Sequence, residues 1–206
     1  TVGTNALIQR RCGKVAVVTT EGFRDLLEIG RQIRPMVYDI HLDSPRPLVP
    51  RRLRLEVSER RRADGVVHRP LDEEEVREAG KWLAGEGVDC VIVCFLHSYA
   101  YPEHAERAVE ILRAIMPPEV HVMSSTSVYS EFREYERFST AVLNGALVTV
   151  MDAYLDRFTA QVAGLGVRAD PKVSQSAGGL MSIDMTRKLP IRACLSGPAA
   201  GLLGAA

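Results

Sequence analysis

Three short apolar segments stand out in the pattern of hydrophobic and polar positions along the chain. Residues 14–19 read KVAVVT, a β-branched run that predicts a buried strand. Residues 90–96 read CVIVCFL and are apolar at every position, which is typical of a strand covered on both faces by helices. Residues 120–123 predict another strand, and residues 172–175 a last one.

Two helical patterns separate the strands in the middle of the chain. Asp72 and Glu75 have the spacing of a capping box, and the apolar positions that follow fall on one face of a helix as far as Gly85. Pro102 opens a second helix, whose apolar stripe continues to Ile115. Alternation of strands and helices requires crossover connections, so we predict an α/β fold with a mainly parallel sheet flanked by helices.

The segments around this alternation predict a short helix, an irregular loop and a long helix. A helix over residues 23–29 should end at Gly30, where glycine can adopt a left-handed cap. Several prolines within residues 31–50 exclude a regular helix or central strand there. The helical period resumes at Glu134 and continues almost to Gly164, with an expected break near Gly145.

Residues 52–67 alternate apolar and charged side chains and contain an Asp64-Gly65 dipeptide. That dipeptide supports the positive φ of a tight turn, so we expect an exposed antiparallel hairpin. Its many arginines favour a solvated edge that discourages aggregation over a basic binding surface.

Composition restricts the class of partner. The chain of 206 residues is 46% hydrophobic and 25% charged, and its net charge is zero, so the long-range attraction that a nucleic-acid partner needs is missing. We find no apolar run close to the roughly 20 residues of a membrane span and no secretory signal, and we expect a cytoplasmic protein without a membrane partner. The four cysteines form no CxxC pair and are interpreted as buried, reduced thiols.

Two glycine-containing segments near the C-terminus are candidates for anion binding. Residues 175–179 read QSAGG and residues 195–201 read LSGPAAG. Both can bring bare backbone amides close to a phosphate, although a tight turn is the more common use of such glycines. Neither segment matches a P-loop or a full GxGxxG fingerprint.

Other candidate residues are less specific. His97 follows the apolar strand at the edge where α/β proteins place ligands, and it is interpreted either as a base or substrate contact or as a hydrogen-bonded structural histidine. Glu136 and Arg137 belong to a charged run at the start of the long helix, where exposed ion pairs are the ordinary outcome. The five histidines show no metal-binding spacing, and Ser196 does not lie in a GxSxG nucleophile elbow.

Taken in order, several strings resemble one family along essentially the whole chain. They are TVGTNALIQRR, VAVVTTEGFRDLLEIGRQ, PLDEEEV, REYERFSTAVLN, QSAGG and LSGPAAG, and they are similar to the hydantoinase A / 5-oxoprolinase family. The resemblance implies an incomplete ribonuclease-H-like, actin-like ATPase fold, in which ATP lies between two lobes. Residues 1–130 would be the rest of the N-terminal lobe and residues 131–206 the start of the ATPase lobe.

The resemblance also implies an activity. Family members use ATP to activate a carbonyl compound by phosphorylation, so we expect a fragment of an ATP-dependent cyclic-amide hydrolase. The alternatives are a subunit of an acetone-type carboxylase and a module without catalytic activity. A hydantoinase B-type subunit or domain and a small cyclic amide would be the partners, and the protein would be an oligomer.

The chain begins at Thr1 without Met and ends at Ala206 in a Gly/Ala-rich segment, so we expect a fragment that is inactive alone. The acidic, glycine-rich loops that grip the phosphates and Mg²⁺ in this family are absent from it. The residues that the resemblance assigns are therefore auxiliary. Those near the nucleotide are Thr1, Thr4, Asn5, Gly178, Gly179, Ser196 and Gly197, and those toward the substrate are His97, Glu136 and Arg137.

Overall fold

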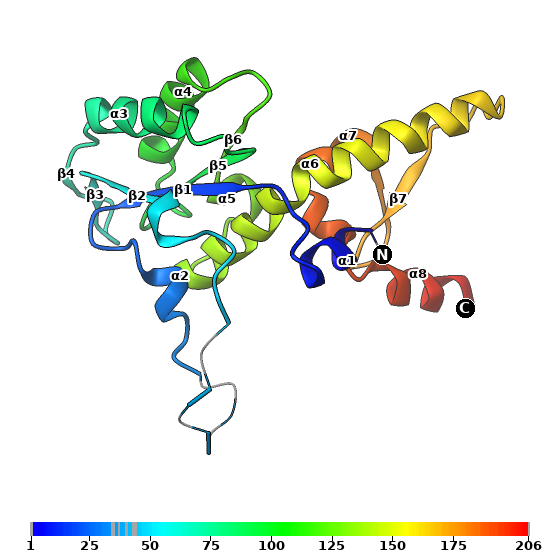
Figure 1. Cartoon of the computed structure of the whole chain (residues 1–206), viewed down its shortest axis with the longest axis horizontal. Coiled ribbons are helices and arrows are strands. Elements are labelled where there is room, and N and C mark those ends of the chain that lie inside the picture. The colour runs from blue at the N-terminus through cyan, green and yellow to red at the C-terminus, as the bar shows by residue number, and fades with distance from the viewer. Residues whose placement is uncertain (1, 34–35, 37, 40, 43–44, 206) are drawn as a thin grey trace. The chain divides into compact units, whose positions relative to one another are not determined.

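In the computed structural model, which describes residues 2–33, 36, 38–39, 41–42 and 45–205, four parallel strands form a sheet in the order β2-β1-β5-β6 (Figure 1). The strands are β1 (Val15–Thr20), β2 (Arg54–Val57), β5 (Cys90–Cys94) and β6 (His121–Ser124). Every residue of β1 and β5 is buried. The parallel sheet predicted from the apolar segments is thus confirmed.

Helices cover this sheet. Helices α3 (Glu73–Ala84) and α4 (Glu103–Ile115) pack side by side on it, as Figure 1 shows. Short helix α5 (Ser125–Val128) contacts β5 and β6. Long helix α6 (Glu134–Gly164) adds the buried side chains of Phe138 and Ala141. Covering helices explain why β5 is apolar at every position.

Two compact units divide the chain. Lys14–Val142 form one, which we call the sheet unit, and residues 1–13 with 143–206 form the other, the helical unit. The division differs from the two lobes expected at residue 130, because α1 (Val2–Ile8) joins the second half of α6 through a core of Ala6, Leu147 and Met151. The assignment of lobes stays a prediction.

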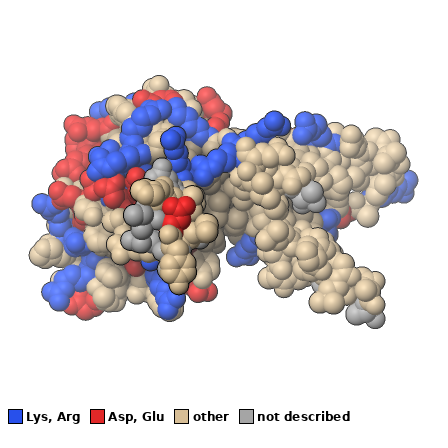
Figure 2. All heavy atoms as spheres, turned by 60° about the horizontal axis from the view of Figure 1, so that its bottom comes forward, with Lys and Arg blue, Asp and Glu red and all other residues tan. Residues whose placement is uncertain are grey.

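The helical unit holds the remaining elements. They are a two-stranded antiparallel hairpin of β7 (Lys172–Ser174) and β8 (Leu180–Ser182), helix α7 (Ile183–Lys188), the 3-10 helix η2 (Pro190–Ala193) and helix α8 (Ser196–Ala205). Asn144 is fully buried and links α6 to this region, since its side chain donates to Lys188 O and accepts from the amide of Ile191. In the view of Figure 2 the surface of this unit carries few charged side chains, whereas the sheet unit is dense in both signs.

The region predicted as one hairpin is divided between two sheets. β2 pairs in parallel with β1, with Arg54 opposite Val17, so the prediction that this segment is a hairpin arm was wrong. Alternation of apolar and charged residues fits the edge strand of a parallel sheet equally well. The antiparallel hairpin is formed by β3 (Arg60–Arg61) and β4 (Val67–Arg69) alone, and the predicted turn is confirmed by Gly65 at φ +86°.

Local signals at the helix ends were partly right. Asp72 caps α3 by accepting from the amides of Glu74 and Glu75, but the carboxylate of Glu75 binds Ser58 and so does not complete a capping box. The first short helix, α2, covers only Leu26–Ile29 and ends at Gly30 with φ +55°. The predicted break near Gly145 is absent, because α6 is continuous and its middle is held by buried contacts.

Helix α6 is also long and apolar enough, by length and composition, to cross a membrane. This corrects the expectation that no segment approaches that length. Of the 18-residue stretch of α6 that is apolar enough, 56% is buried inside the structure, which is the pattern of a core helix.

The cysteines that the structure describes are all free. Cys90 and Cys94 are buried in β5, and burial raises the pKa of the Cys94 thiol to about 12. Cys12 and Cys194 are half-buried, so the expectation of buried thiols is confirmed for the pair in the sheet only.

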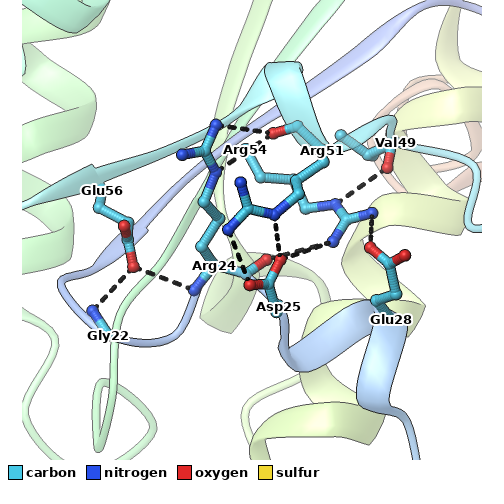
Figure 3. Close-up of polar contacts among 8 residues, drawn as sticks. All are labelled: Gly22, Arg24, Asp25, Glu28, Val49, Arg51, Arg54 and Glu56. Atoms are coloured by element: carbon cyan, nitrogen blue, oxygen red, sulfur yellow. Dashed lines mark hydrogen bonds and ion pairs between the residues drawn. The ribbon is translucent and has the colours of Figure 1, made fainter.

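Arg54, the first residue of β2, ties the edge of the sheet to α2 (Figure 3). Its side chain is 2% exposed; Nε donates to Val49 O at 3.0 Å, Nη1 to Arg24 O at 3.3 Å and Nη2 to Glu28 Oε2 at 3.0 Å. A buried guanidinium is tolerated only when its donors are paired in this way. The short 3-10 helix η1 (Arg51–Leu53) leads into the strand.

A second charged pair reinforces the same edge. Arg51 donates to both oxygens of Asp25, at 2.8 and 3.0 Å, and this bond holds the pKa of the Asp25 carboxyl below its usual range. Glu56 of β2 accepts from the amides of Gly22 and Arg24. These contacts fix the turn after β1 against β2, as Figure 3 shows.

We predict that Arg54→Met lowers the free energy of unfolding by about 2–3 kcal/mol, because two backbone carbonyls lose their buried donor. Urea unfolding would measure it. The matched control is Arg52→Met, since the Arg52 side chain is 56% exposed and, among the described residues, pairs with Glu86 alone; its cost should stay below about 1 kcal/mol. Equal effects of the two variants would contradict this role of Arg54.

Candidate functional site

A buried carboxylate lies at the carboxyl edge of the parallel sheet. Glu59, in the connection between β2 and β3, is 2% exposed. Its Oε1 accepts a hydrogen bond from the hydroxyl of Thr20, the last residue of β1, and its Oε2 lies 2.9 Å from Nδ1 of His104 in the first turn of α4. Both carboxylate oxygens are therefore satisfied in a place where an unpaired charge would be very unfavourable.

The same network reaches the segment that follows β5. The hydroxyl of Thr20 accepts from the amide of Leu96 at 3.1 Å, and the neighbouring Thr19 donates to Cys94 O at 2.8 Å. The ends of β1 and β5 and the start of the hairpin are thus joined at one edge. In α/β proteins ligands bind beyond this edge.

His97 lies directly beyond that edge, as expected from its position after the apolar run. Its backbone has φ +52°, a left-handed conformation that costs energy for a residue with a Cβ. The ring is half-buried, and its Nδ1 is buried with no hydrogen-bond partner among the described residues. The structural interpretation of His97, a histidine held by a hydrogen bond to a nearby loop, is therefore not supported at Nδ1.

A pocket of about 350 Å³ opens beside His97. It is lined by Arg60, Arg61, Arg62, Ala63, His68 and His97. The hairpin of β3 and β4 therefore brings arginines, which the sequence favoured as a solvated edge, to the strand end that was a candidate ligand site.

Arg137 is fully buried in the sheet unit. Its Nη2 donates to Phe95 O at 2.9 Å and its Nη1 to Glu131 O at 3.1 Å, and the guanidinium lies 5.5 Å from the ring centroid of Tyr99. Burial lowers the pKa of this guanidinium from its ordinary value. These contacts hold the segment on either side of His97, since Phe95 and Tyr99 flank it. A direct contact of Arg137 with substrate stays a prediction.

Glu136 has a different environment. It is part-exposed and forms an ion pair with Arg31. The pKa of its carboxyl is lowered, mainly by a hydrogen bond from its own backbone and to a smaller extent by the hydrogen bond from Arg31. Its role toward the substrate is untested, and the geometry does not bring it to the pocket beside His97.

In the helical unit, Gly178 and Gly179 form the turn between β7 and β8. Their φ values of +88° and +79° are left-handed, so these positions need glycine. The turn is closed by bonds between Gln175 and the two glycines. Tight-turn geometry, one of the two alternatives for QSAGG, is therefore present.

This turn lines a pocket of about 290 Å³ together with α8. Its walls are Ser174, Gln175, Gly178, Gly179, Leu180, Ala200 and Gly204. The two glycine-containing segments that sequence analysis selected for phosphate binding thus meet at one pocket, although α8 contributes Ala200 and Gly204 rather than Ser196 and Gly197.

Thr4 contacts the start of α8 from α1. Its hydroxyl accepts from the amide of Leu195 at 3.2 Å, and Leu195 has φ +57°. Ser196 and Gly197 follow in the first turn of α8, where backbone amides are free of helical partners. Asn5 is exposed on α1, and Thr1 lies outside the described residues. Binding roles for these residues stay predictions.

The buried network of Thr20, Glu59 and His104 was not predicted from the sequence. Glu59 is 39 residues from Thr20 and 45 from His104, so no local spacing could reveal it. The only signal was their position at strand ends and at a helix start. Within the described part of the chain, no group of three His, Cys, Asp or Glu side chains is arranged to hold a metal ion.

Two family models match the chain. The model of the hydantoinase/oxoprolinase N-terminal region matches residues 1–116, more than half of the chain, and that of hydantoinase/oxoprolinase matches residues 137–206. The chain belongs to the hydantoinase/oxoprolinase family. The resemblance stated from the sequence strings is confirmed.

Relatives within the hydantoinase/oxoprolinase family include two named enzymes. The chain is 36% identical to the caprolactamase subunit alpha of Pseudomonas jessenii over 97% of its length, and 33% identical to 5-oxoprolinase 1 of Arabidopsis thaliana over 99%. It spans only 29% of the first relative and 17% of the second.

Solved structures of the family agree with the fold. The crystal structure of the ATP-dependent caprolactamase of Pseudomonas jessenii matches 98% of the chain with a TM-score of 0.91 and 36% identity, and the chain covers 30% of it. A nucleotide-free structure of acetone carboxylase matches 100% of the chain with a TM-score of 0.86 and 28% identity, again with 30% of that chain covered. The predicted actin-like ATPase type of fold, with a mainly parallel sheet and flanking helices, is thereby confirmed.

We predict that Glu59→Ala lowers the free energy of unfolding by about 2–3 kcal/mol, because the buried donors on Thr20 and His104 lose their acceptor. Denaturant unfolding would measure the change. Glu103→Ala is the control, since the Glu103 side chain is 62% exposed and its one ion pair within the described part of the chain is with Arg61; it should cost less than about 1 kcal/mol. A Glu59→Ala variant as stable as the control would show that the network does not support the fold.

Proposed function

We propose that this chain is part of an ATP-dependent enzyme that hydrolyses the C–N bond of a cyclic amide. The observation that carries the proposal is the likeness to caprolactamase, in sequence at 36% identity and in structure at a TM-score of 0.91. Similarity to 5-oxoprolinase supports the same class of substrate. The free cysteines and the use of ATP support a cytoplasmic location.

The pocket between the Gly178-Gly179 turn and α8 is the part of the chain best suited to approach a nucleotide phosphate. Gly178 and Gly179 carry no side chains that would keep a phosphate away from the backbone of the turn, although the amide of Gly178 already donates to Gln175 O at 3.2 Å; the small residues of α8 leave the opposite wall open. ATP, when bound, would supply a phosphoryl group to the amide carbonyl oxygen. Thr4 would hold the backbone at Leu195, and so the first turn of α8, in position.

Mg²⁺ normally accompanies the phosphates of ATP, and we include it in the proposal on chemical grounds. Because no three acidic, histidine or cysteine side chains converge among the described residues, we assign no metal ligand in this chain.

A second enzyme class is supported by the acetone carboxylase structure, which matches the whole chain at 28% identity. Under this alternative the enzyme would carboxylate a small ketone with bicarbonate. Lower identity than that to caprolactamase makes it the second candidate. A third possibility, a module that only contacts other subunits, would require that no ATP is consumed.

We also propose a partner subunit or domain of the hydantoinase B type. Support comes from the caprolactamase relative, which is a subunit alpha. The hydantoinase B type of the partner and the oligomeric state rest only on the resemblance of the sequence to the family.

The test uses the full-length protein with its partner, and it measures ADP release with caprolactam, 5-oxoproline, N-methylhydantoin or acetone plus bicarbonate. We expect a cyclic amide to stimulate ATP hydrolysis and to yield the ring-opened amino acid. ATP consumption with acetone plus bicarbonate only would select the carboxylase, and no ATP consumption with any of the four would remove both enzyme hypotheses.

We further predict that Gly179→Ala in the full-length protein reduces ATP-dependent turnover about tenfold or more, because a Cβ enters the wall of the proposed phosphate pocket and strains a backbone at φ +79°. Gly166→Ala is the matched control: Gly166 has φ +71° and open space around it, but does not line the pocket. Both variants carry similar strain of about 1–2 kcal/mol. Equal loss of turnover in the two would assign the effect to strain rather than to the pocket.

A further inference from the structure

The pocket beside His97 is made almost entirely of cationic and histidine side chains. Three consecutive arginines, Arg60, Arg61 and Arg62, line it with His68 and His97, and none of the described residues that line it is acidic. It belongs wholly to the sheet unit and contains none of the glycine-containing segments to which we assign the nucleotide. Its chemistry therefore calls for an explanation separate from ATP.

The arginines differ in their existing partners. Arg61 is committed, because its Nε donates to Gly65 O at 3.1 Å, its Nη1 pairs with Glu103 at 2.6 Å and its guanidinium lies over the ring of Tyr101 at 4.9 Å. These contacts anchor the hairpin to the start of α4. Arg61 thus fixes the shape of the pocket more than it offers free donors.

Arg60 has its charge available. Its guanidinium stacks on the ring of Phe23 at 5.0 Å, and within the described part of the chain it makes no hydrogen bond or ion pair. Stacking on one face holds the guanidinium in place and leaves its edge donors unused. Because Glu59, the preceding residue, is fixed by Thr20 and His104, the backbone that carries Arg60 is fixed as well.

Arg62 adds a second cation that a ligand could recruit. It pairs with Asp64 at 3.2 Å, but both side chains are more than half exposed, so the pair is weak. His97 also lines the pocket, on a backbone with left-handed φ, and its buried Nδ1 has no hydrogen-bond partner among the described residues. An unsatisfied ring nitrogen and left-handed φ together are features of residues kept for binding rather than for packing.

We propose that this pocket binds a small oxyanion, a carboxylate or a phosphate, with Arg60 as its main ligand and Arg62 and His97 as supporting contacts. Planar guanidinium groups match the two oxygens of such anions, whereas the same lining repels a metal cation. The proposal does not depend on which enzyme class is correct. Ring opening of a cyclic amide produces a carboxylate, a carboxylase takes up bicarbonate, and use of ATP releases phosphate, so each activity presents a suitable anion.

Titration of the 206-residue chain tests the proposal. Acetate, bicarbonate and phosphate would be added at matched ionic strength and pH, with acetamide as the neutral analogue, and binding followed by calorimetry and by the ring resonances of His97. We expect saturable binding with a Kd on the order of 1 mM, as for a few charge-assisted hydrogen bonds in an open pocket. Tighter binding of acetate would identify a carboxylate site, and tighter binding of phosphate a phosphate site; acetamide should not bind.

Matched variants separate this site from general surface charge. Arg60→Met should weaken anion binding about tenfold, and Arg60→Lys should retain part of the affinity because it keeps the charge but loses the planar fork. Arg77→Met removes an arginine from the exposed face of α3, where it pairs with Glu73 and Glu74, and should leave binding unchanged.

Several outcomes would overturn the proposal. They are the absence of saturable binding by any of the three anions, equal weakening by Arg60→Met and Arg77→Met, and saturation that leaves the His97 ring resonances unmoved. Unfolding curves of each variant would show that a loss of binding is not a loss of fold.

Discussion

The carboxylate of Glu59, buried between Thr20 and His104, is the interaction on which the functional edge of the sheet unit depends. A charge in this place is stable only while both of its oxygens accept hydrogen bonds, so the end of β1, the residues after β2 and the start of α4 must stay together. Thr20 extends the constraint to Leu96 and hence to the segment that carries His97. The hydrogen-bonded carboxylate of Glu59 thus holds the ends of β1 and β5 in place.

Two sites of different character follow from the two units. In the sheet unit the fixed hairpin brings arginine side chains to His97, and recognition there would depend on charge. In the helical unit the turn at Gly178 and Gly179 faces the small residues of α8, and recognition would depend on bare backbone. The proposed function would use both kinds of contact, one for the phosphate of ATP and one for a second small molecule.

Elements with a strong, local periodicity were predictable from the sequence. The apolar run of β5, the long helix α6 and the turn at Gly65 all follow from residues close together in the chain. The pattern in β2 did not decide how that strand pairs. Leu55 and Val57 would alternate with charged residues in either a hairpin arm or a parallel edge strand, and only the pairing of β2 with β1 distinguishes the two. The contact between Glu59 and His104 was also not predictable, because a tertiary contact between residues so far apart in the chain leaves no local sequence pattern.

The central claim is that Glu59 and His104 stabilise the edge through their mutual contact. A double-mutant cycle with Glu59→Ala, His104→Ala and the double variant, measured by urea unfolding at neutral pH, tests it most directly. The account predicts a coupling free energy of about 1–3 kcal/mol, the range for residues joined in one buried network. Additive single effects, within about 0.5 kcal/mol, would contradict it.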